Sequence, residues 1–395
     1  MNVLGHKRAF LYLSIFLFFF HSSSTVISTF LPVYFQEEQL TGTQIGWLMA
    51  VGPFSSLLSQ PFWGYISDRY KTIKKILLLC LVGVISCSII LFQVNSFLML
   101  LFLCAIFYSF LSPIGAFGDS LALHTSQIVG SSFGRIRMWG SVGYAVTSYL
   151  GGQILTRIGL EHLLYPYLAF TIIAFVFCWK VMDINTPSAP INLKGAVRNI
   201  FRPNFLFFLL IIMFVTIPHR TNDIFSGIYI KELGGNESLI GLSWFVAVAF
   251  EAIVFLLSPL WLRFFNEMTY MVIASGLYGV RWFLFSLAET PSQIILLQAL
   301  HGITFGIFYL CSFQYVSNLF PNEFRATGQL FFISVFFGLS AIIGSLGGGM
   351  ILDVFNGQML YKLLSYLAFA GFAGLLGFTA YSGKKLRPGS EILQK

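Results

Sequence analysis

The stretch AFLYLSIFLFFFHSSSTVISTFL, residues 9–31, contains no Asp, Glu, Lys or Arg and is long enough to cross a lipid bilayer. A membrane-spanning helix needs roughly 20 mostly apolar residues, because the hydrocarbon core is about 30 Å thick and a helix rises about 1.5 Å per residue. Eleven further windows of similar character follow, at residues 45–67, 76–94, 97–119, 136–157, 162–182, 205–230, 240–262, 270–288, 292–316, 328–352 and 358–381. The sequence therefore predicts an all-α membrane protein with twelve transmembrane helices in two six-helix bundles.

The composition supports this interpretation. Hydrophobic residues make up 57% of the chain and charged residues only 10%, whereas soluble domains are about 25% charged. Such a chain cannot cover itself with a water-facing surface, so lipid must cover it. The windows lack the period-two alternation of a transmembrane β-barrel, and each is therefore expected to be a helix.

A basic stretch from Lys180 to Pro203 separates the two sets of windows. We therefore expect an N-terminal six-helix bundle over residues 1–183, a cytoplasmic linker over 184–203 and a C-terminal six-helix bundle over 204–395. A faint repeat agrees with this division, since Gln60-Pro61-Phe62-Trp63 is echoed by Ser258-Pro259-Leu260-Trp261 at the equivalent place in the second half. Internal repeats are typical of secondary transporters, whose binding site lies between the halves.

The distribution of basic residues predicts the orientation. If the N-terminus is cytoplasmic, most Lys and Arg residues fall at the cytoplasmic side, and only Arg157, Lys231 and Lys362 fall clearly outside. The positive-inside rule then places both termini in the cytoplasm and the protein in the plasma (inner) membrane. The net charge of +8 is explained by this topology, so no nucleic-acid partner is expected.

No cofactor or metal is expected. The cysteines lie inside apolar windows without a C-x-x-C spacing, which favours packing thiols over disulfides or metal ligands. The glycine-rich segment Gly344 to Gly349 lacks the Lys-Ser/Thr that follows in a phosphate-binding loop, so it indicates close helix packing or bending. Without a nucleotide-binding motif, an ion gradient is the available energy source.

Two loop segments resemble signatures of the major facilitator superfamily. Gly64-Tyr65-Ile66-Ser67-Asp68-Arg69 is similar to G-x-x-x-D-R/K, and Pro321-Asn322-Glu323-Phe324-Arg325-Ala326-Thr327 is similar to P-x-x-x-R-A-T. The first match is partial, because Lys71 stands where the family has Gly, and Asn266-Glu267 replaces Asp-Arg in the second half. The resemblance spans essentially the whole chain and implies the major facilitator fold.

Within the first signature, Gly64, Asp68 and Arg69 are expected to form a conformational latch. An Asp at the inner end of one helix can accept hydrogen bonds from N–H groups at the start of a neighbouring helix and so hold the inner face closed in one state. The alternative is a solvated pair of loop charges.

Asp119 ends the fourth window and Arg137 opens the fifth, so a helical hairpin brings these opposite charges together. Ionisable groups in spans cost at least about 2.5–3.5 kcal/mol each and normally face a cavity and a partner. The acid, the Arg eighteen residues later and Tyr144 seven residues beyond resemble the lactose permease-like branch, and within it the phenylpropionate permease-like group. That resemblance implies that all three bind substrate, with Arg137 donating a bidentate hydrogen bond, Asp119 orienting it and Tyr144 offering a flat face. The alternative is a static interhelical ion pair.

Proton coupling is expected in the second half. Arg281 and His301 align with the Arg and His of the family's proton-coupling region, but the acid that follows the His in lactose permease-like proteins is Thr304 here. Glu251 is the first choice for the proton carrier, because a carboxyl group in a low-dielectric span takes up a proton readily. Asp119 is the second choice.

The seventh window carries a polar stripe next to Pro218. His219, Asn222, Asp223 and Ser226 share one helical face, which suits a cavity wall or outer gate, and His219 and Asn222 are expected to contact substrate together with His301. The alternative is an interfacial role for the stripe. His21 with the following Ser22 to Thr25 is interpreted in the same way, as a cavity-facing patch or a histidine bonded to a neighbouring helix.

The predicted function is secondary active transport of a small organic solute by alternating access, with proton symport and an aromatic acid such as phenylpropionate as the solute. Alternatives are a sugar or nucleoside proton symporter, a drug efflux carrier or a receptor-like sensor on a carrier fold. An intramembrane enzyme is not expected, because H-E-x-x-H, G-x-S-x-G and paired intramembrane aspartates are missing from the sequence. The expected partners are the solute, protons and the lipid bilayer, and the protein is expected to be monomeric.

Overall fold

The computed structural model describes residues 3–183, 201–321 and 324–385, and every regular element in these ranges is helical. The first group of helices, here called the N-terminal bundle, comprises α1 (Val3–Glu37), α2 (Gly42–Tyr70), α3 (Lys74–Leu91), α4 (Phe97–Val129), α5 (Phe133–Ile158), the short 3-10 helix η1 (Leu160–His162) and α6 (Leu164–Lys180). Residues 184–200 of the predicted linker lie outside the described residues.

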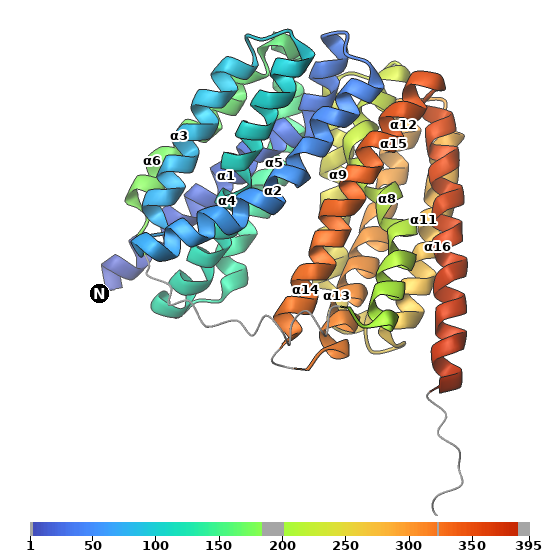
Figure 1. The fold of residues 1–395 in the computed structure, drawn as a ribbon. Helices are drawn as coiled ribbons and strands as arrows, with labels where there is room; N and C mark the ends of the chain where they lie inside the picture. The colour runs from blue at the N-terminus through green and yellow to red at the C-terminus, as the bar shows by residue number, and fades with distance from the viewer. Residues whose placement is uncertain (1–2, 184–200, 322–323, 386–395) are drawn as a thin grey trace, which may run out of the picture.

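The second group, the C-terminal bundle, begins at Pro203. It comprises α8 (Pro203–Glu232), α9 (Glu237–Leu256), α10 (Ser258–Trp261), α11 (Glu267–Ser286), α12 (Pro291–Gln298), η2 (Gly302–Gly306), α13 (Ile307–Leu319), α14 (Arg325–Ile333), η4 (Ser334–Leu339), α15 (Ser340–Val354) and α16 (Gly357–Lys385). Figure 1 shows the two bundles side by side, together at one end and apart at the end where the N-terminus lies.

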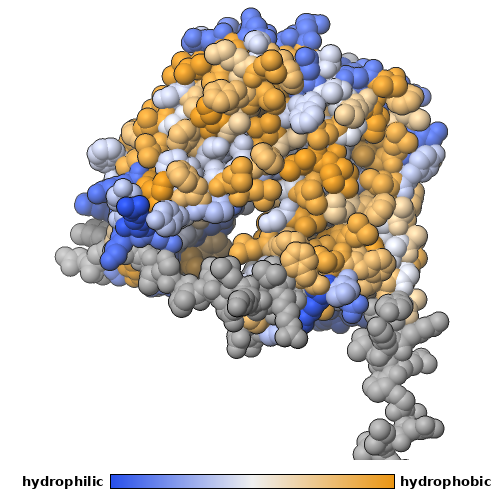
Figure 2. All heavy atoms as spheres, viewed as in Figure 1, coloured by the Kyte–Doolittle hydropathy of each residue, from blue (hydrophilic) through white to orange (hydrophobic). Residues whose placement is uncertain are grey.

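The surface is that of a membrane protein. Among the described residues, nine helices or uninterrupted helical runs are long and apolar enough to cross a membrane. The helices α2, α5 and α11 are 29, 26 and 20 residues long and lie between these nine in the chain, but they hold more polar and small residues. Hydrophobic side chains form a broad band between hydrophilic ends (Figure 2). The nine and these three correspond to the predicted windows.

Several helices differ in detail from the predicted windows. Polar residues extend the helix ends, so that α1 continues to Glu37 instead of ending near residue 31. In the C-terminal bundle, two predicted spans are interrupted by the π-helical segments η2 and η4. A π-helical turn widens the helix locally and is frequent at functional sites, and both segments lie beside the central cavity described below.

We call the end of the molecule that carries the N-terminus and the α2–α3 loop the basic face, because Arg69, Lys71, Lys74 and Lys75 lie in this loop and in the helix ends beside it. The other end is called the opposite face. At the basic face the side chains of Asp68 and Arg69 are exposed. The carboxylate that accepts from the first N–H groups of a neighbouring helix is Asp183, bonded to Ile73 N (3.1 Å) and Lys74 N (3.0 Å). The latch role of Gly64, Asp68 and Arg69 therefore stays a prediction, and it concerns a state in which this face is closed.

At the opposite face the bundles are in direct contact. Thr41 caps α2 through a reciprocal pair of hydrogen bonds with Gln44, and the exposed N–H groups of this helix start bond to Asp353 of α15: Gly42 N at 2.5 Å and Thr43 N at 2.8 Å. Lys231 of α8 bridges Glu37 of α1 (2.8 Å) and Glu237 of α9 (2.6 Å).

Two glycines make the contact between α5 and α9 this close. A Cβ on Gly241 would overlap the carbonyl oxygen of Ser148, and one on Gly152 would overlap that of Glu237. Backbone therefore meets backbone here, as small residues permit at helix interfaces in membranes. The structure is thus closed at the opposite face and open at the basic face.

Candidate functional site

A cavity of about 740 Å³ lies between the two bundles. A second chamber of about 230 Å³ continues from it and shares the side chains of Tyr144, Arg220, Asp223, Trp244 and Phe337. The walls come from α1, α2, α4, α5, α8, α9, η2, α14, η4 and α15. Contributions from both bundles are what alternating access around a central site requires.

The predicted ion pair is present on the N-terminal side of the cavity. Arg137 Nε lies 2.6 Å from Asp119 Oδ1, and the two side chains are 30% and 45% exposed. Arg137 also lines the second chamber. Neither side chain is fully buried between helices, but Asp119 lines neither chamber. Whether the pair binds substrate stays a prediction.

His21 of α1 lies against this pair. A Cβ on Gly140 would contact both the His21 ring and Arg137 Nη1, so the glycine makes room for the two side chains in the same space. In the described part of the chain, His21 Nε2 has no hydrogen-bond partner, and the ring lines the second chamber. Of the two interpretations of His21, the cavity-facing one fits the structure.

Aromatic rings from both bundles meet in the second chamber, which Arg137 also lines. Tyr144 of α5 and Trp244 of α9 approach with ring centroids 6.4 Å apart and planes at 74°, and both line the cavity. Edge-to-face contact is a favourable arrangement of two aromatic rings, so these side chains form an aromatic part of the cavity wall. Tyr144 was among the predicted site residues, whereas Trp244 was not, because one Trp in an apolar window gives no sign of which face it occupies.

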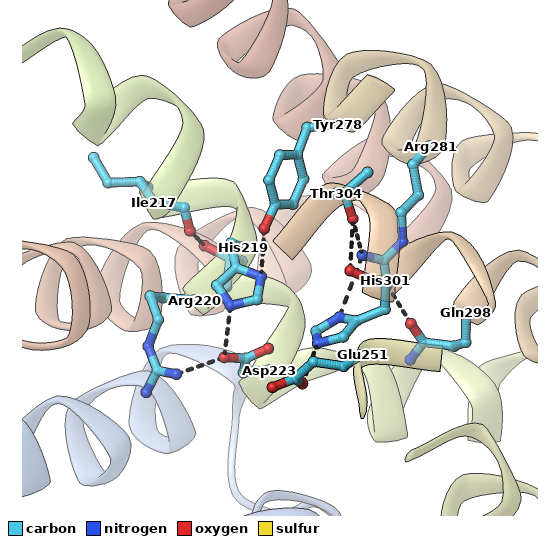
Figure 3. Close-up of polar contacts among 11 residues, drawn as sticks. Ile217, His219, Arg220, Asp223, Glu251, Tyr278, Arg281, Gln298, His301 and Thr304 are labelled. Carbon is cyan, nitrogen blue, oxygen red and sulfur yellow. Dashed lines mark hydrogen bonds and ion pairs between the residues drawn. The ribbon is translucent and has the colours of Figure 1, made fainter. Parts of the chain in front are cut away.

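The C-terminal bundle contributes two carboxylates, each next to a histidine (Figure 3). Asp223 Oδ2 is 2.5 Å from Arg220 Nη1 and 3.6 Å from His219 Nε2. Glu251 Oε2 of α9 is 3.5 Å from His301 Nε2. Phe305 stacks on His219, with centroids 4.7 Å apart and planes at 8°, and so fixes the orientation of that ring. The predicted proton-coupling residues Glu251 and His301 are thus brought together.

Arg281 lies behind this layer, fully buried within the C-terminal bundle. It donates hydrogen bonds to Gln298 and to Thr304, the latter at 3.1 Å, and its Nη1 is 3.4 Å from His301 Nδ1. Arg281 does not line the cavity and contacts it only through His301. Asp119, the second choice for the proton carrier, lies across the interface in the other bundle.

Asn222 is placed differently from the prediction. Its Oδ1 accepts a hydrogen bond from Tyr361 of α16 at 2.9 Å, and the residue is fully buried within the C-terminal bundle. Helical spacing predicts Asn222 beside His219 and Asp223. A residue three positions after His219 is, however, rotated by about 60° from it around the helix axis, and this rotation turns Asn222 toward α16. Asn222 therefore supports the bundle interior and is not a wall of the cavity.

Two bundles of apolar helices around a central cavity, with paired charges on those helices, are typical of a membrane transport protein. The model of the MFS_1 like family matches residues 10–363, and the chain belongs to this family of the major facilitator superfamily. It is a secondary transporter, and its relatives are named as transporters and permeases, not enzymes.

Among these relatives are the uncharacterized transporter YwbF of Bacillus subtilis, 26% identical over 93% of this chain and 91% of that protein, and the maltose permease of Geobacillus stearothermophilus, 26% identical over 88% of each. The probable 3-phenylpropionic acid transporter of Escherichia coli is 25% identical over 95% of this chain and 96% of its own. A mutant of the nucleoside transporter NupG has the same fold, with a TM-score of 0.85 at 16% identity over 94% of this chain and 99% of that chain.

Proposed function

We propose that this protein is a proton symporter that imports a small aromatic carboxylic acid, of the class of phenylpropionate, by alternating access. The proposed location is the plasma membrane, with both termini and the basic face in the cytoplasm. The cavity of the described structure then opens inward, and the Asp353 and Lys231 contacts close the outer side.

The charge balance around the cavity is the observation that carries this proposal. When the histidines are neutral, the guanidinium groups of Arg137, Arg220 and Arg281 are balanced by the carboxylates of Asp119, Asp223 and Glu251. Protonation of Glu251 leaves one positive charge without a counter-charge. A carboxylate solute supplies that counter-charge, so proton and anion stabilise each other in a desolvated site.

The walls suit the rest of such a solute. The contact with Asp119 uses Arg137 Nε, so its terminal nitrogens can form a bidentate pair with a carboxylate. Tyr144 and Trp244 provide apolar faces nearby for an aromatic ring. The resemblance of the chain to a probable 3-phenylpropionic acid transporter supports the same solute class.

A sugar or nucleoside is the second candidate. Relatives and structural neighbours include a maltose permease and a nucleoside transporter, and each cavity-facing Arg already has a carboxylate partner. A neutral hydroxylated solute would bind to these pairs without separating them. Drug efflux is a third possibility that transport direction would reveal.

The test is uptake into proteoliposomes under an imposed pH gradient, with phenylpropionate, maltose and a nucleoside as separate solutes. Phenylpropionate is expected to accumulate and to alkalinise the external medium. Arg137→Gln should reduce its uptake at low concentration by about tenfold or more, since a hydrogen bond to a charged group contributes about 1.5–3 kcal/mol, and Arg137→Lys should restore little because the bidentate geometry is lost.

Lys362→Gln is a control for general loss of positive charge, because this residue lies outside the cavity near the opposite face. Accumulation of maltose or the nucleoside alone would overturn the aromatic-acid assignment. Equal uptake by the wild type and Arg137→Gln would remove Arg137 from the site.

A further inference from the structure

The hydrogen bonds around Arg281 have only one possible direction. A guanidinium group donates and never accepts. Its Nη2 donates to Gln298 Oε1, and its Nη1 donates to Thr304 Oγ1 at 3.1 Å. The Thr304 hydroxyl donates its hydrogen to the Leu300 carbonyl oxygen at 2.8 Å, which agrees with Thr304 accepting a hydrogen bond from Arg281.

The same rule decides the state of His301. Arg281 Nη1 lies 3.4 Å from His301 Nδ1, so Nδ1 must be the acceptor. A neutral imidazole that accepts at Nδ1 carries its hydrogen on Nε2. The Nε2 atom faces Glu251 Oε2 at 3.5 Å, and the His301 N–H therefore points toward the carboxylate (Figure 3).

Among the described residues, no nearby carboxylate compensates the positive charge of Arg281 beside His301. Its polar partners in the described residues are neutral, and no carboxylate there lies within 4.0 Å of it. A second positive charge on the imidazole beside a buried guanidinium is unfavourable in a low-dielectric interior. A proton that enters this site is therefore stabilised on Glu251 and not on His301.

Gln298 fixes this arrangement from behind. Its Nε2 donates to Ser243 Oγ at 3.0 Å, which orients the amide so that Oε1 faces Arg281. The residue is fully buried and does not line either chamber. It acts on the cavity only through Arg281 and His301.

We propose that Gln298 and Arg281 are positioning residues that hold His301 neutral with its hydrogen on Nε2, so that Glu251 alone binds the transported proton. The link to transport rests on the proposed proton symport. The charged and titratable groups that face the His301 site are Glu251 from α9, Arg281 and Tyr278 from α11, His219, Arg220 and Asp223 from α8, Arg137 and Tyr144 from α5, and His21 from α1.

The experiment is nitrogen NMR of protein with 15N-labelled histidine in lipid bilayers, with the His301 signals identified by their loss in His301→Gln. In the wild type, we expect the neutral Nε2–H form at about pH 7. In Gln298→Glu, a carboxylate beside Arg281 offsets the charge of the guanidinium, and we expect the share of the Nε2–H form of His301 at the same pH to fall. Gln358→Glu, the same change at an exposed position of α16, should leave the His301 signals unchanged.

A wild-type signal for the Nδ1–H form, or for imidazolium at about pH 7, would overturn the proposal. Identical His301 spectra in the wild type and Gln298→Glu would also overturn it. If Gln298→Glu does not fold, the tautomer of His301 in the wild type still tests the proposal. Uptake by the same preparations tests the proposed proton symport separately from the His301 tautomer. Absence of proton-driven uptake in the wild type would contradict the proposed function, while the NMR spectrum would still report the tautomer.

Discussion

The carboxylate of Asp353, at the end of α15, accepts hydrogen bonds from the backbone N–H groups of Gly42 (2.5 Å) and Thr43 (2.8 Å) at the start of α2. An anion at a helix N-terminus satisfies N–H groups that have no partner within the helix and interacts favourably with the helix dipole. Since α2 and α15 belong to different bundles, this contact exists only while the opposite face is closed.

Asp353→Asn is therefore expected to favour opening of the opposite face. Because the carboxylate is exposed, we expect the closed state of the opposite face to lose about 1 kcal/mol of stabilisation. This corresponds to about a fivefold shift in the equilibrium between the closed and open states. The measurement is alkylation of a cysteine placed at Ser28, a cavity residue, by an impermeant maleimide added on the side of the opposite face.

Glu289→Gln is the matched control, because it removes another exposed carboxylate between α11 and α12. Alkylation should rise in Asp353→Asn and stay at the wild-type rate in Glu289→Gln. Equal rates in all three proteins would mean that the Asp353 contact does not stabilise the closed face.

Gly241→Val is expected to prevent closure of the opposite face. The added Cβ overlaps the Ser148 carbonyl oxygen of the other bundle, and backbone cannot move aside as a side chain can. We expect transport to be lost while solute still binds from the opposite face, measured by uptake and by equilibrium binding. Gly347→Val, on α15 where a Cβ meets nothing within 4 Å, should transport normally, and equal loss in both variants would point to general misfolding.

Glu251→Gln is expected to abolish proton-driven accumulation but to retain exchange of solute across the membrane, since exchange needs no release of the proton. The readouts are uptake under a pH gradient and counterflow in its absence. Asp119→Asn is the comparison, because Asp119 is the other candidate for the proton carrier. Accumulation that persists in Glu251→Gln and disappears in Asp119→Asn would transfer the role to Asp119.

Trp244→Leu is expected to raise the KM for an aromatic solute by about three- to tenfold, because an aromatic contact contributes about 0.5–1.5 kcal/mol beyond its area. The side chain is 8% exposed and lies at the cavity wall next to Tyr144. Trp179→Leu is the control, since Trp179 on α6 is 64% exposed on the outer surface. A KM that changes equally in both variants would exclude a role for the Trp244 ring in binding.

The sequence predicted the helices and the Asp119–Arg137 contact because both depend on local information. Window length and hydropathy define a span, and a hairpin of neighbouring helices brings its ends together. The closure of the opposite face could not be predicted. Asp353 and Gly42 are far apart in the sequence, and neither segment contains a pattern that indicates contact with the other.

The polar stripe of α8 shows a second limit. Spacing grouped Asn222 with His219 and Asp223, but only packing against α16 reveals that Asn222 turns toward Tyr361. Gln298 was also missed, because a single amide in an apolar window carries no signal until the guanidinium of Arg281 is placed beside it.

The π-helical segments η2 and η4 both belong to the C-terminal bundle and both contribute side chains to the cavity, Phe305 from η2 and Phe337 from η4. A widened turn can return to ordinary α-helical pitch by sliding its hydrogen bonds along by one residue. Occupancy of the cavity can thus be converted into a twist of the helix beyond it. Among the described residues such turns occur in the C-terminal bundle alone, so we expect the C-terminal half of this carrier to be the half whose helices deform when solute binds.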